Sequence, residues 1–160
     1  MGYIGPLTVR ATDLGIDPSN AMLLAVEQYN LNRKENEPKV NLFINDDKWN
    51  PDNAPAYEKL KKEHDISVAF VSHSNSTINI QDHVLKDKVI LVNPLNNGEL
   101  LDSLNKNTFK IAKSTEQANG LIAIRIIELG LKKTAVFKFP NDYMTRASME
   151  VKRLLEKSNV

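Results

Sequence analysis

Short apolar runs of β-forming residues alternate along the chain with longer segments whose apolar side chains recur every three or four positions. Strands separated by helices of ~10–15 residues are typical of parallel sheets joined by right-handed crossovers. The sequence therefore predicts an open, mostly parallel, doubly wound α/β sheet with helices on both faces. The runs with strand character are Tyr3–Thr8, Val40–Asn45, Ile66–Ser72, Lys88–Val92, Thr108–Lys113 and Thr134–Phe139.

Capping residues mark where the helices begin and end. Asp17–Asn20 combine an N-cap with a proline suited to a first turn, so we expect the first helix to start there. Ser114–Gln117 form a capping box that opens a later helix, and Gly130 is expected to end that helix in the left-handed conformation. The segment Asn93–Lys106 has the composition of a surface loop.

Composition excludes several functional classes. The chain has 160 residues, which favours one domain, and 21 Lys plus Arg against 20 Asp plus Glu leave a net charge of +1. That balance gives no overall field for nucleic acid or an anionic membrane. The compact cluster Lys59, Lys61 and Lys62 is flanked by Glu58 and Glu63, as in a solvated helix face. No stretch reaches the ~20 apolar residues of a membrane span. Met1–Ile4 shows no secretory signal, which is absent or was removed, and without cysteine there is no disulfide or thiolate metal site.

Polar residues that follow the strands are the candidates for binding, because ligands of open α/β sheets lie outside the carboxyl ends of the strands. Ser72–Thr77 is the segment richest in hydroxyl groups. A serine at a helix start offers its hydroxyl beside free backbone N–H groups, which suits the carboxylate of a small acid. The alternative is that Ser74 and Ser76 only cap their own helix. Asn75-Ser76-Thr77 also has the form of a glycosylation sequon.

The other polar clusters favour structural roles. Asp46 and Asp47 are paired as in Mg²⁺ sites, but no glycine-rich phosphate loop accompanies them. A turn whose carboxylates accept backbone N–H bonds is the preferred interpretation. His64, His73 and His83 lack the spacing of a zinc site. The sequence also has no nucleophile elbow and no dinucleotide-binding glycine motif, so the residues for acyl transfer and nucleotide hydrolysis are missing. We predict no metal and no cofactor.

Several short sequences occur here in an order and spacing characteristic of one family. They are Ile4-Gly5-Pro6-Leu7-Thr8, Leu24-Ala25-Val26-Glu27 with Asn30, Asp46-Asp47 with Asn50-Pro51 and Ala54, Ser74 to Thr77, Val92-Asn93-Pro94, Thr108-Phe109-Lys110-Ile111 and the turn with Tyr143. In these segments the chain resembles the type I periplasmic binding proteins, especially the branched-chain amino-acid receptors that feed ABC transporters. The resemblance covers the whole chain and implies Rossmann-like α/β lobes that close on a small ligand without catalysis.

The resemblance implies a set of ligand contacts. In the family, lobe one grips the α-amino and α-carboxylate groups through a serine at a helix start and through loop groups after the next strand. By position, these groups are Ser74, the backbone of Leu95, and Asn97, while Tyr143 falls where the second lobe supplies an aromatic wall. The expected ligand-binding residues are Ser74, Asn75, Ser76, Thr77, Leu95, Asn97 and Tyr143.

Three departures from the family pattern bear on specificity and stability. Leu95–Gly98 replaces a segment that usually has small residues with Thr or Ser, so another small polar ligand could take the place of an amino acid. Met144 follows Tyr143 where a glycine is usual. Trp49 and His73 stand where some relatives have a disulfide pair, and that covalent link is therefore lost.

The resemblance also implies organisation, location and partners. Residues 1–113 correspond to a lobe-one-like core and residues 114–160 to the start of lobe two, as helix, strand and helix, which makes the two-lobed fold incomplete. We expect an extracytoplasmic protein, in the periplasm or at the cell surface, that delivers an amino-acid-like solute to an ABC transporter permease. An unpaired sheet edge favours self-association.

Two other functions share features with this reading of the sequence. One is a ligand-sensing domain of a receptor or transcriptional regulator with the same fold. The other is a receiver-type phospho-acceptor domain that would use Asp46 and Asp47. The receiver is disfavoured because it needs a further acidic residue at the end of the third strand, where this chain has Ser72 and Ser74.

Overall fold

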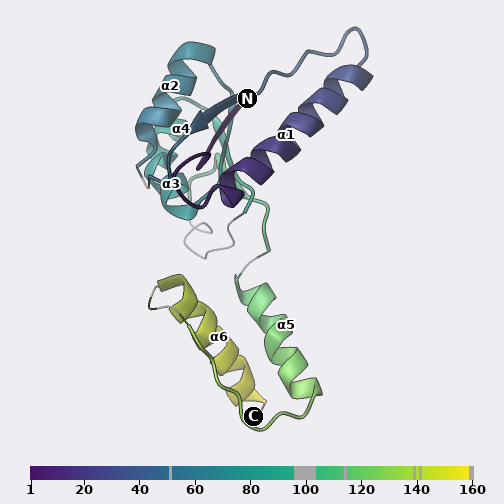
Figure 1. Cartoon of the computed structure of the whole chain (residues 1–160), viewed down its shortest axis with the longest axis vertical. Helices are drawn as coiled ribbons and strands as arrows, with labels where there is room; N and C mark the ends of the chain where they lie inside the picture. The colour runs from purple at the N-terminus through teal and green to yellow at the C-terminus, as the bar shows by residue number, and fades with distance from the viewer. Residues whose placement is uncertain (51, 96–103, 114, 139, 141, 159–160) are drawn as a thin grey trace. The chain divides into compact units, whose positions relative to one another are not determined.

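The computed structural model describes residues 1–50, 52–95, 104–113, 115–138, 140 and 142–158, without the side chains of residues 115–117, 142, 143 and 146. These residues divide into two compact units, the first ending at Ala112 and the second starting at Lys113. Figure 1 shows the first unit built around a sheet and the second built from two long helices.

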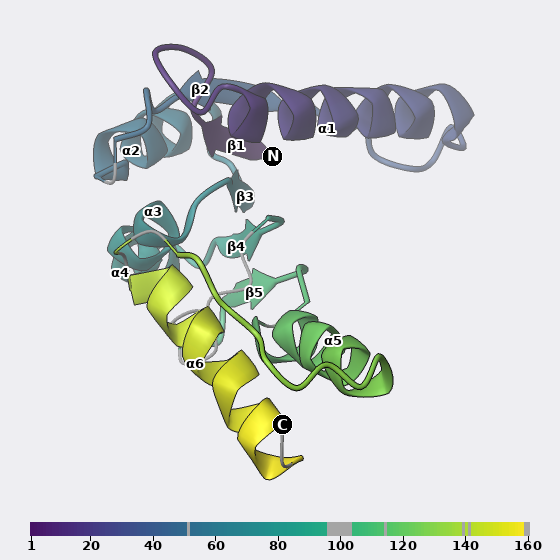
Figure 2. The same ribbon diagram turned by 60° about the horizontal axis from the view of Figure 1, so that its bottom comes forward.

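The first unit contains a fully parallel sheet of five strands in the order β2-β1-β3-β4-β5 (Figure 2). Tyr3 of β1 pairs with Ile44 of β2 on one side and with Phe70 of β3 on the other. The predicted parallel α/β sheet is confirmed. The strand order changes direction between β1 and β3, where open sheets of this kind form their ligand crevice. The strands are β1 (Gly2–Gly5), β2 (Phe43–Asp46), β3 (Val68–Val71), β4 (Ile90–Asn93) and β5 (Thr108–Lys110).

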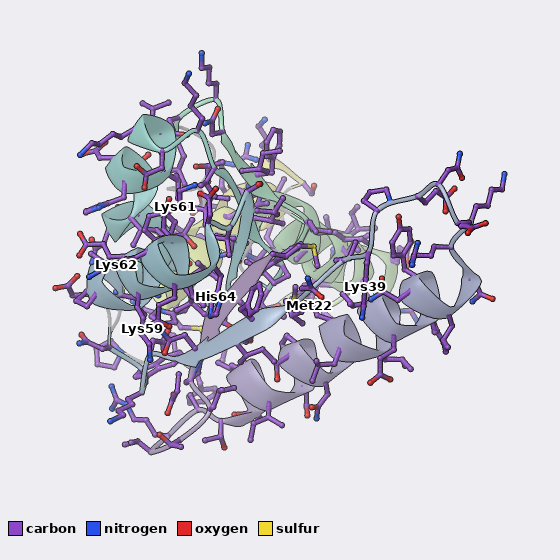
Figure 3. All side chains as sticks on the ribbon, turned by 90° about the horizontal axis from the view of Figure 1, so that it is seen from above. Met22, Lys39, Lys59, Lys61, Lys62 and His64 are labelled. Atoms are coloured by element: carbon purple, nitrogen blue, oxygen red, sulfur yellow. The ribbon has the colours of Figure 1, made fainter. Side chains whose placement is uncertain are left out.

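Helices cover both faces of this sheet. The connection between β1 and β2 contains α1 (Asp13–Asn32), and α2 (Ala54–His64), α3 (Ser74–Asn79) and α4 (Gln81–Lys86) lie on the opposite side (Figure 1). The chain moves from β1 to β2 in one direction along the sheet, and from β2 to β3 and on to β4 in the other. Right-handed crossovers in opposite directions place their helices on opposite faces, so the arrangement is doubly wound as predicted. Figure 3 shows Lys59, Lys61 and Lys62 along α2, away from α1.

The core of the first unit lies between the sheet and helices α2 to α4. Ile4, Val71 and Leu91 of the strands are fully buried there together with Tyr57 of α2. Burying one such side chain contributes roughly 1.5–3 kcal/mol, so this cluster fixes the helices on the sheet. The Tyr57 hydroxyl donates a hydrogen bond to Asp87 Oδ2 at 3.0 Å. Burial, that hydrogen bond and the negative charge of Asp87 all raise the pKa of Tyr57 well above its usual range.

The first helix begins about one turn earlier than predicted, with Pro18 inside it. Pro18 has no N–H to bond the Leu14 carbonyl, which lies 3.5 Å from the Tyr3 hydroxyl. The same hydroxyl donates to the Gly15 carbonyl at 2.8 Å. A Cβ atom on Gly15 would lie 1.9 Å from the carbonyl oxygen of Pro6. The early turn is therefore stabilised by tertiary contact with β1 and the loop after it, which local capping signals do not show.

The second unit consists of α5 (Thr115–Glu128) and α6 (Asp142–Lys157), which pack through Ala123, Val151 and Leu155. Gly130 has a φ of +65°, which confirms the left-handed position after α5. The strand predicted at 134–139 is not formed over residues 134–138, which pair with no strand in the described part of the chain. A strand needs a partner for its backbone groups, and the described residues of this unit supply none.

Two expectations lie partly or wholly outside the described residues. These are the capping role of Ser114 and the centre of the loop between β4 and β5, residues 96–103. Across the residues that are described, no helix is both long enough and apolar enough to cross a membrane.

Candidate functional site

The carboxylate of Asp46, the last residue of β2, joins the loops that follow β1 and β2. Its Oδ1 atom accepts hydrogen bonds from the Leu7 amide at 2.8 Å and the Lys48 amide at 2.9 Å, and its Oδ2 atom accepts the Thr8 hydroxyl. Burial alone would raise the pKa of this carboxyl, but the bonds from the Thr8 hydroxyl and from three backbone amides outweigh it. They hold the pKa of Asp46 below its ordinary value. The two loops are thereby tied together at the carboxyl edge of the sheet.

A buried row of polar side chains connects the β2–α2 loop with the start of α3. His73 Nε2 lies 2.9 Å from Asp47 Oδ2, and Ser76 Oγ lies 3.0 Å from His73 Nδ1. Ser76 also donates to the Asn50 carbonyl at 3.3 Å, and the Trp49 ring lies 4.9 Å from the His73 ring. The Asp, His and Ser side chains occur in the order of a hydrolase triad. Ser76 is fully buried, so its hydroxyl is not accessible to solvent in this arrangement.

Tyr3, within β1, and Ser72, directly after β3, form a second buried polar contact between the two strands that flank the change in strand order. Their hydroxyl groups are hydrogen-bonded to each other. Burial raises the pKa of Tyr3, so this phenol stays protonated. A Cβ atom on Gly5 would lie 2.4 Å from Ser72 Oγ and 2.7 Å from the Tyr3 hydroxyl oxygen. A side chain at the end of β1 would therefore require the Ser72 and Tyr3 hydroxyl groups to move from this contact.

The segment predicted to bind the ligand starts α3, and its four residues differ in accessibility. Ser74 is the first residue of the helix and is half-buried, and Asn75 is exposed. Ser76 and Thr77 are fully buried. The Thr77 hydroxyl donates to the His73 carbonyl at 3.0 Å. Ser74 and Asn75 are therefore the accessible members of the predicted set, and Ser76 and Thr77 hold the segment in place.

The connection after β4 lies next to this segment. Asn93 is buried, donates through Nδ2 to Thr77 Oγ1 at 2.8 Å, and accepts the Leu95 amide at 3.2 Å. The resemblance implied a ligand contact through the backbone of Leu95, and its N–H is bonded to Asn93 here. Asn97 lies outside the described residues, and for Tyr143 the structure describes only the backbone, within α6.

The preferred interpretation of Asp46 and Asp47 as turn residues is confirmed. Asp47 Oδ1 accepts the Trp49 amide at 2.9 Å, and Asp46 accepts the amides given above. A cavity of about 270 Å³ lies beside both carboxylates. Within the described part of the chain, no group of three or more His, Asp or Glu side chains is arranged to hold a metal ion.

Sequence reasoning did not identify the pairing of Asp47 with His73, or the roles of Tyr3 and Asn93. The signal in the sequence that could have indicated this pairing is that Asp47 and His73 each closely follow a strand. The strand order that brings the ends of β2 and β3 close enough for contact was not available from the sequence. Asn93 was noted as the first polar residue after a predicted strand and as part of the resemblance, but its bridging role was not predicted, although an amide at a strand end is suited to bridging two loops.

No protein-family profile matches the sequence, and no curated protein matches it significantly. Solved structures do match its fold. An ABC-transporter solute-binding protein from Rhodopseudomonas palustris BisB5, in complex with 3,4-dihydroxybenzoic acid, has a TM-score of 0.87 at 16% identity, covering 99% of this chain and 44% of that one. An ABC-transporter solute-binding protein from R. palustris, in complex with benzoate, has a TM-score of 0.81 at 17% identity, covering 99% and 44%.

A third match is an ABC-transporter substrate-binding protein from Desulfitobacterium hafniense in complex with Leu. Its TM-score is 0.82 at 16% identity, covering 100% of this chain and 48% of that one. The chain therefore spans less than half the length of the structures it matches. It has the fold of the amino-terminal ~45% of type I periplasmic binding proteins, and its sheet corresponds to one lobe of that fold. All three matches are described as binding proteins, not as enzymes.

Proposed function

We propose that this chain is part of a non-catalytic receptor that binds a small carboxylate-bearing solute and presents it to an ABC transporter. The observation that carries the proposal is the match of nearly the whole chain to the amino-terminal part of solute-binding proteins, with TM-scores of 0.81 to 0.87. Because fold alone does not determine function, the proposal also depends on the residues at the carboxyl edge.

The carboxyl edge of the first unit supports binding of a small polar solute. Its loops are held by the hydrogen bonds of the half-buried Asp46, and by buried hydrogen bonds of Asp47 with His73 and of Asn93 with Thr77. Accessible polar groups of Ser74 and Asn75 lie on this rigid frame. Such an arrangement binds with little loss of conformational entropy, because the loops are ordered before the ligand arrives.

The chemical class of the solute is inferred from what the matched structures hold. They contain 3,4-dihydroxybenzoic acid, benzoate and Leu, which differ in size and shape but share a carboxylate. A hydroxyl such as that of Ser74 is a suitable partner for a carboxylate. An amino-acid-like acid and an aromatic acid are both consistent with this site.

We further propose that residues 1–113 form lobe one and residues 114–160 begin lobe two, with Asn97 and Tyr143 as additional ligand contacts. The protein would act outside the cytoplasm, with an ABC transporter permease as its partner. Self-association of this chain would use the outer strands of the sheet, β2 and β5.

Ligand-observed NMR on the 160-residue chain tests the proposal, since it detects millimolar binding. We expect saturation transfer to leucine, benzoate or 3,4-dihydroxybenzoate, none to glucose, and recovery of each ligand chemically unchanged. Chemical conversion of a bound ligand, or a folded chain that binds none of the three acids, would contradict the proposed function.

A further inference from the structure

The loop between β1 and α1 carries a cationic side chain, Arg10, at the carboxyl edge of the sheet. This loop follows a central strand, β1, next to the place where the strand order changes direction. Arg10 is exposed, and its guanidinium forms no ion pair or hydrogen bond with any residue that the structure describes. Figure 2 shows the loop, in purple, beside the end of β2.

The loop is fixed at both ends although its tip is exposed. Asp46 accepts bonds from Leu7 and Thr8 on one side of the tip, and the Arg10 amide donates to the Thr8 carbonyl at 3.0 Å. On the other side, the Leu14 amide donates to the Ala11 carbonyl at 3.0 Å as α1 begins. Arg10 therefore extends from a backbone whose position is set before any ligand binds.

Both neighbours of Arg10 adopt the left-handed region, with φ of 75° at Val9 and 53° at Ala11. Positive φ is a clear outlier for a β-branched residue such as valine. Val9 is also 79% exposed, so burial of its side chain does not explain this conformation. Strained backbone that the surrounding contacts maintain is concentrated at binding sites, and here it flanks the one arginine of the loop.

Charge at this edge leaves Arg10 available to an anion. The carboxylates of Asp46 and Asp47 are occupied by backbone amides, Thr8 and His73. Lys48 is also exposed at the carboxyl edge, but it follows the edge strand β2, farther from the change in strand order. A guanidinium binds a carboxylate through two parallel hydrogen bonds, which an ammonium cannot do.

From these observations we infer that Arg10 is the cationic partner of the solute's carboxylate and selects acids over neutral analogues. The inference rests on the proposed function, since it names the residue that recognises the shared group of the solute class. Arg10 would contact the solute from the loop after β1, whereas Ser74 would contact it from the start of α3, after β3.

The test compares each acid with its neutral amide, using benzoate with benzamide and 3,4-dihydroxybenzoate with 3,4-dihydroxybenzamide. Dissociation constants are measured by NMR titration on the full 160-residue chain and on Arg10→Gln, Arg10→Lys and Lys48→Gln. We expect Arg10→Gln to weaken binding of the acid about tenfold or more while binding of the amide stays unchanged. Arg10→Lys should retain part of the preference for the acid, and Lys48→Gln should retain all of it. Because Arg10 is exposed, its variants should unfold at the wild-type temperature.

The outcomes separate this inference from the proposed function. If the wild-type chain binds the acids and Arg10→Gln binds them equally well, Arg10 is not the partner of the carboxylate, although the chain remains a receptor for acids. An equal loss with Lys48→Gln would show a general charge effect and would also overturn the inference. If the wild-type chain binds none of the acids, both the inference and the proposed function are wrong.

Discussion

His73 Nε2 lies 2.9 Å from Asp47 Oδ2, in a contact where the two side chains are 11% and 1% exposed. The contact joins the loop after β2 to the start of α3, across the end of β1. Trp49 packs its ring against His73 at the two positions where the family that this chain resembles sometimes has a disulfide. In a chain without cysteine, an ion pair or hydrogen bond together with ring packing thus connects the same two loops.

Removing this contact should destabilise the first unit. Asp47→Ala leaves His73 and the Trp49 amide without their partner in a buried place, and we expect the free energy of unfolding to fall by about 2–4 kcal/mol. Urea denaturation followed by tryptophan fluorescence measures this change. In a double-mutant cycle, Asp47→Ala and His73→Ala should cost less together than the sum of their separate effects. Strict additivity would show that the two side chains do not interact.

Acid should weaken the attachment of the β1–α1 loop through Asp46. The hydrogen bonds hold the pKa of Asp46 below its ordinary value, so folding gains stability from this group above the unfolded-state pKa near 3.8. That contribution is lost as the pH falls through the lower folded-state pKa. We expect the loss of stability as the pH falls below about 4 to be smaller in Asp46→Asn than in the wild-type chain. Thermal unfolding across that range measures the difference, and identical pH profiles would contradict the assignment.

Gly15 should resist substitution because of its close contact with Pro6. Gly15→Ala would place a methyl group against the Pro6 carbonyl, and we expect it to cost about 1–3 kcal/mol despite the better helix propensity of alanine. The matched control is Gly120→Ala in α5, where the added Cβ would meet only Leu154 Cδ1 at 3.8 Å. That change should be neutral or stabilise by roughly 0.5–1 kcal/mol. Hydrogen exchange of amides in α1 and α5 reports each unit separately, and equal effects would argue against the contact.

Ser74 should contribute to ligand binding more than to folding. If its hydroxyl bonds the carboxylate of the solute, Ser74→Ala should weaken binding by roughly 1–3 kcal/mol. Asn75→Ala, at the neighbouring exposed position, is the control for the loss of a solvent-exposed polar side chain. NMR titration with benzoate measures both variants. Unchanged affinity of Ser74→Ala together with lower stability would identify Ser74 as a residue that only supports the helix start.

The sheet could be predicted because the information for it is local. Ile66–Ser72 and Lys88–Val92 are apolar runs of strand length, and β3 and β4 lie within or beside them. The start of α1 could not be predicted, since it depends on the contact of Gly15 with Pro6 and on the Tyr3 hydroxyl. The strand expected at residues 134–139 failed for a related reason, because pairing requires a partner strand that periodicity does not supply.

The sequence predicted that the candidate site lies at the carboxyl edge of the sheet, but it did not predict which side chains there are accessible. Parallel strands bring their carboxyl ends to one edge, so Ser74 and Leu95 could be expected there. The sequence did not show which hydroxyls face solvent. Ser76 and Thr77 are buried and bonded to His73, which depends on how α3 packs on the sheet.

The most direct test of the account is to locate the bound solute by backbone-amide NMR of the 160-residue chain titrated with benzoate. The account predicts concentration-dependent shifts of the amides of Thr8 to Ala11, Ser74 and Leu95, at the carboxyl edge, with small shifts at the opposite ends of the strands. Shifts centred on the opposite edge or on the exposed face of α2, or no shifts while leucine and 3,4-dihydroxybenzoate also fail to bind, would contradict it.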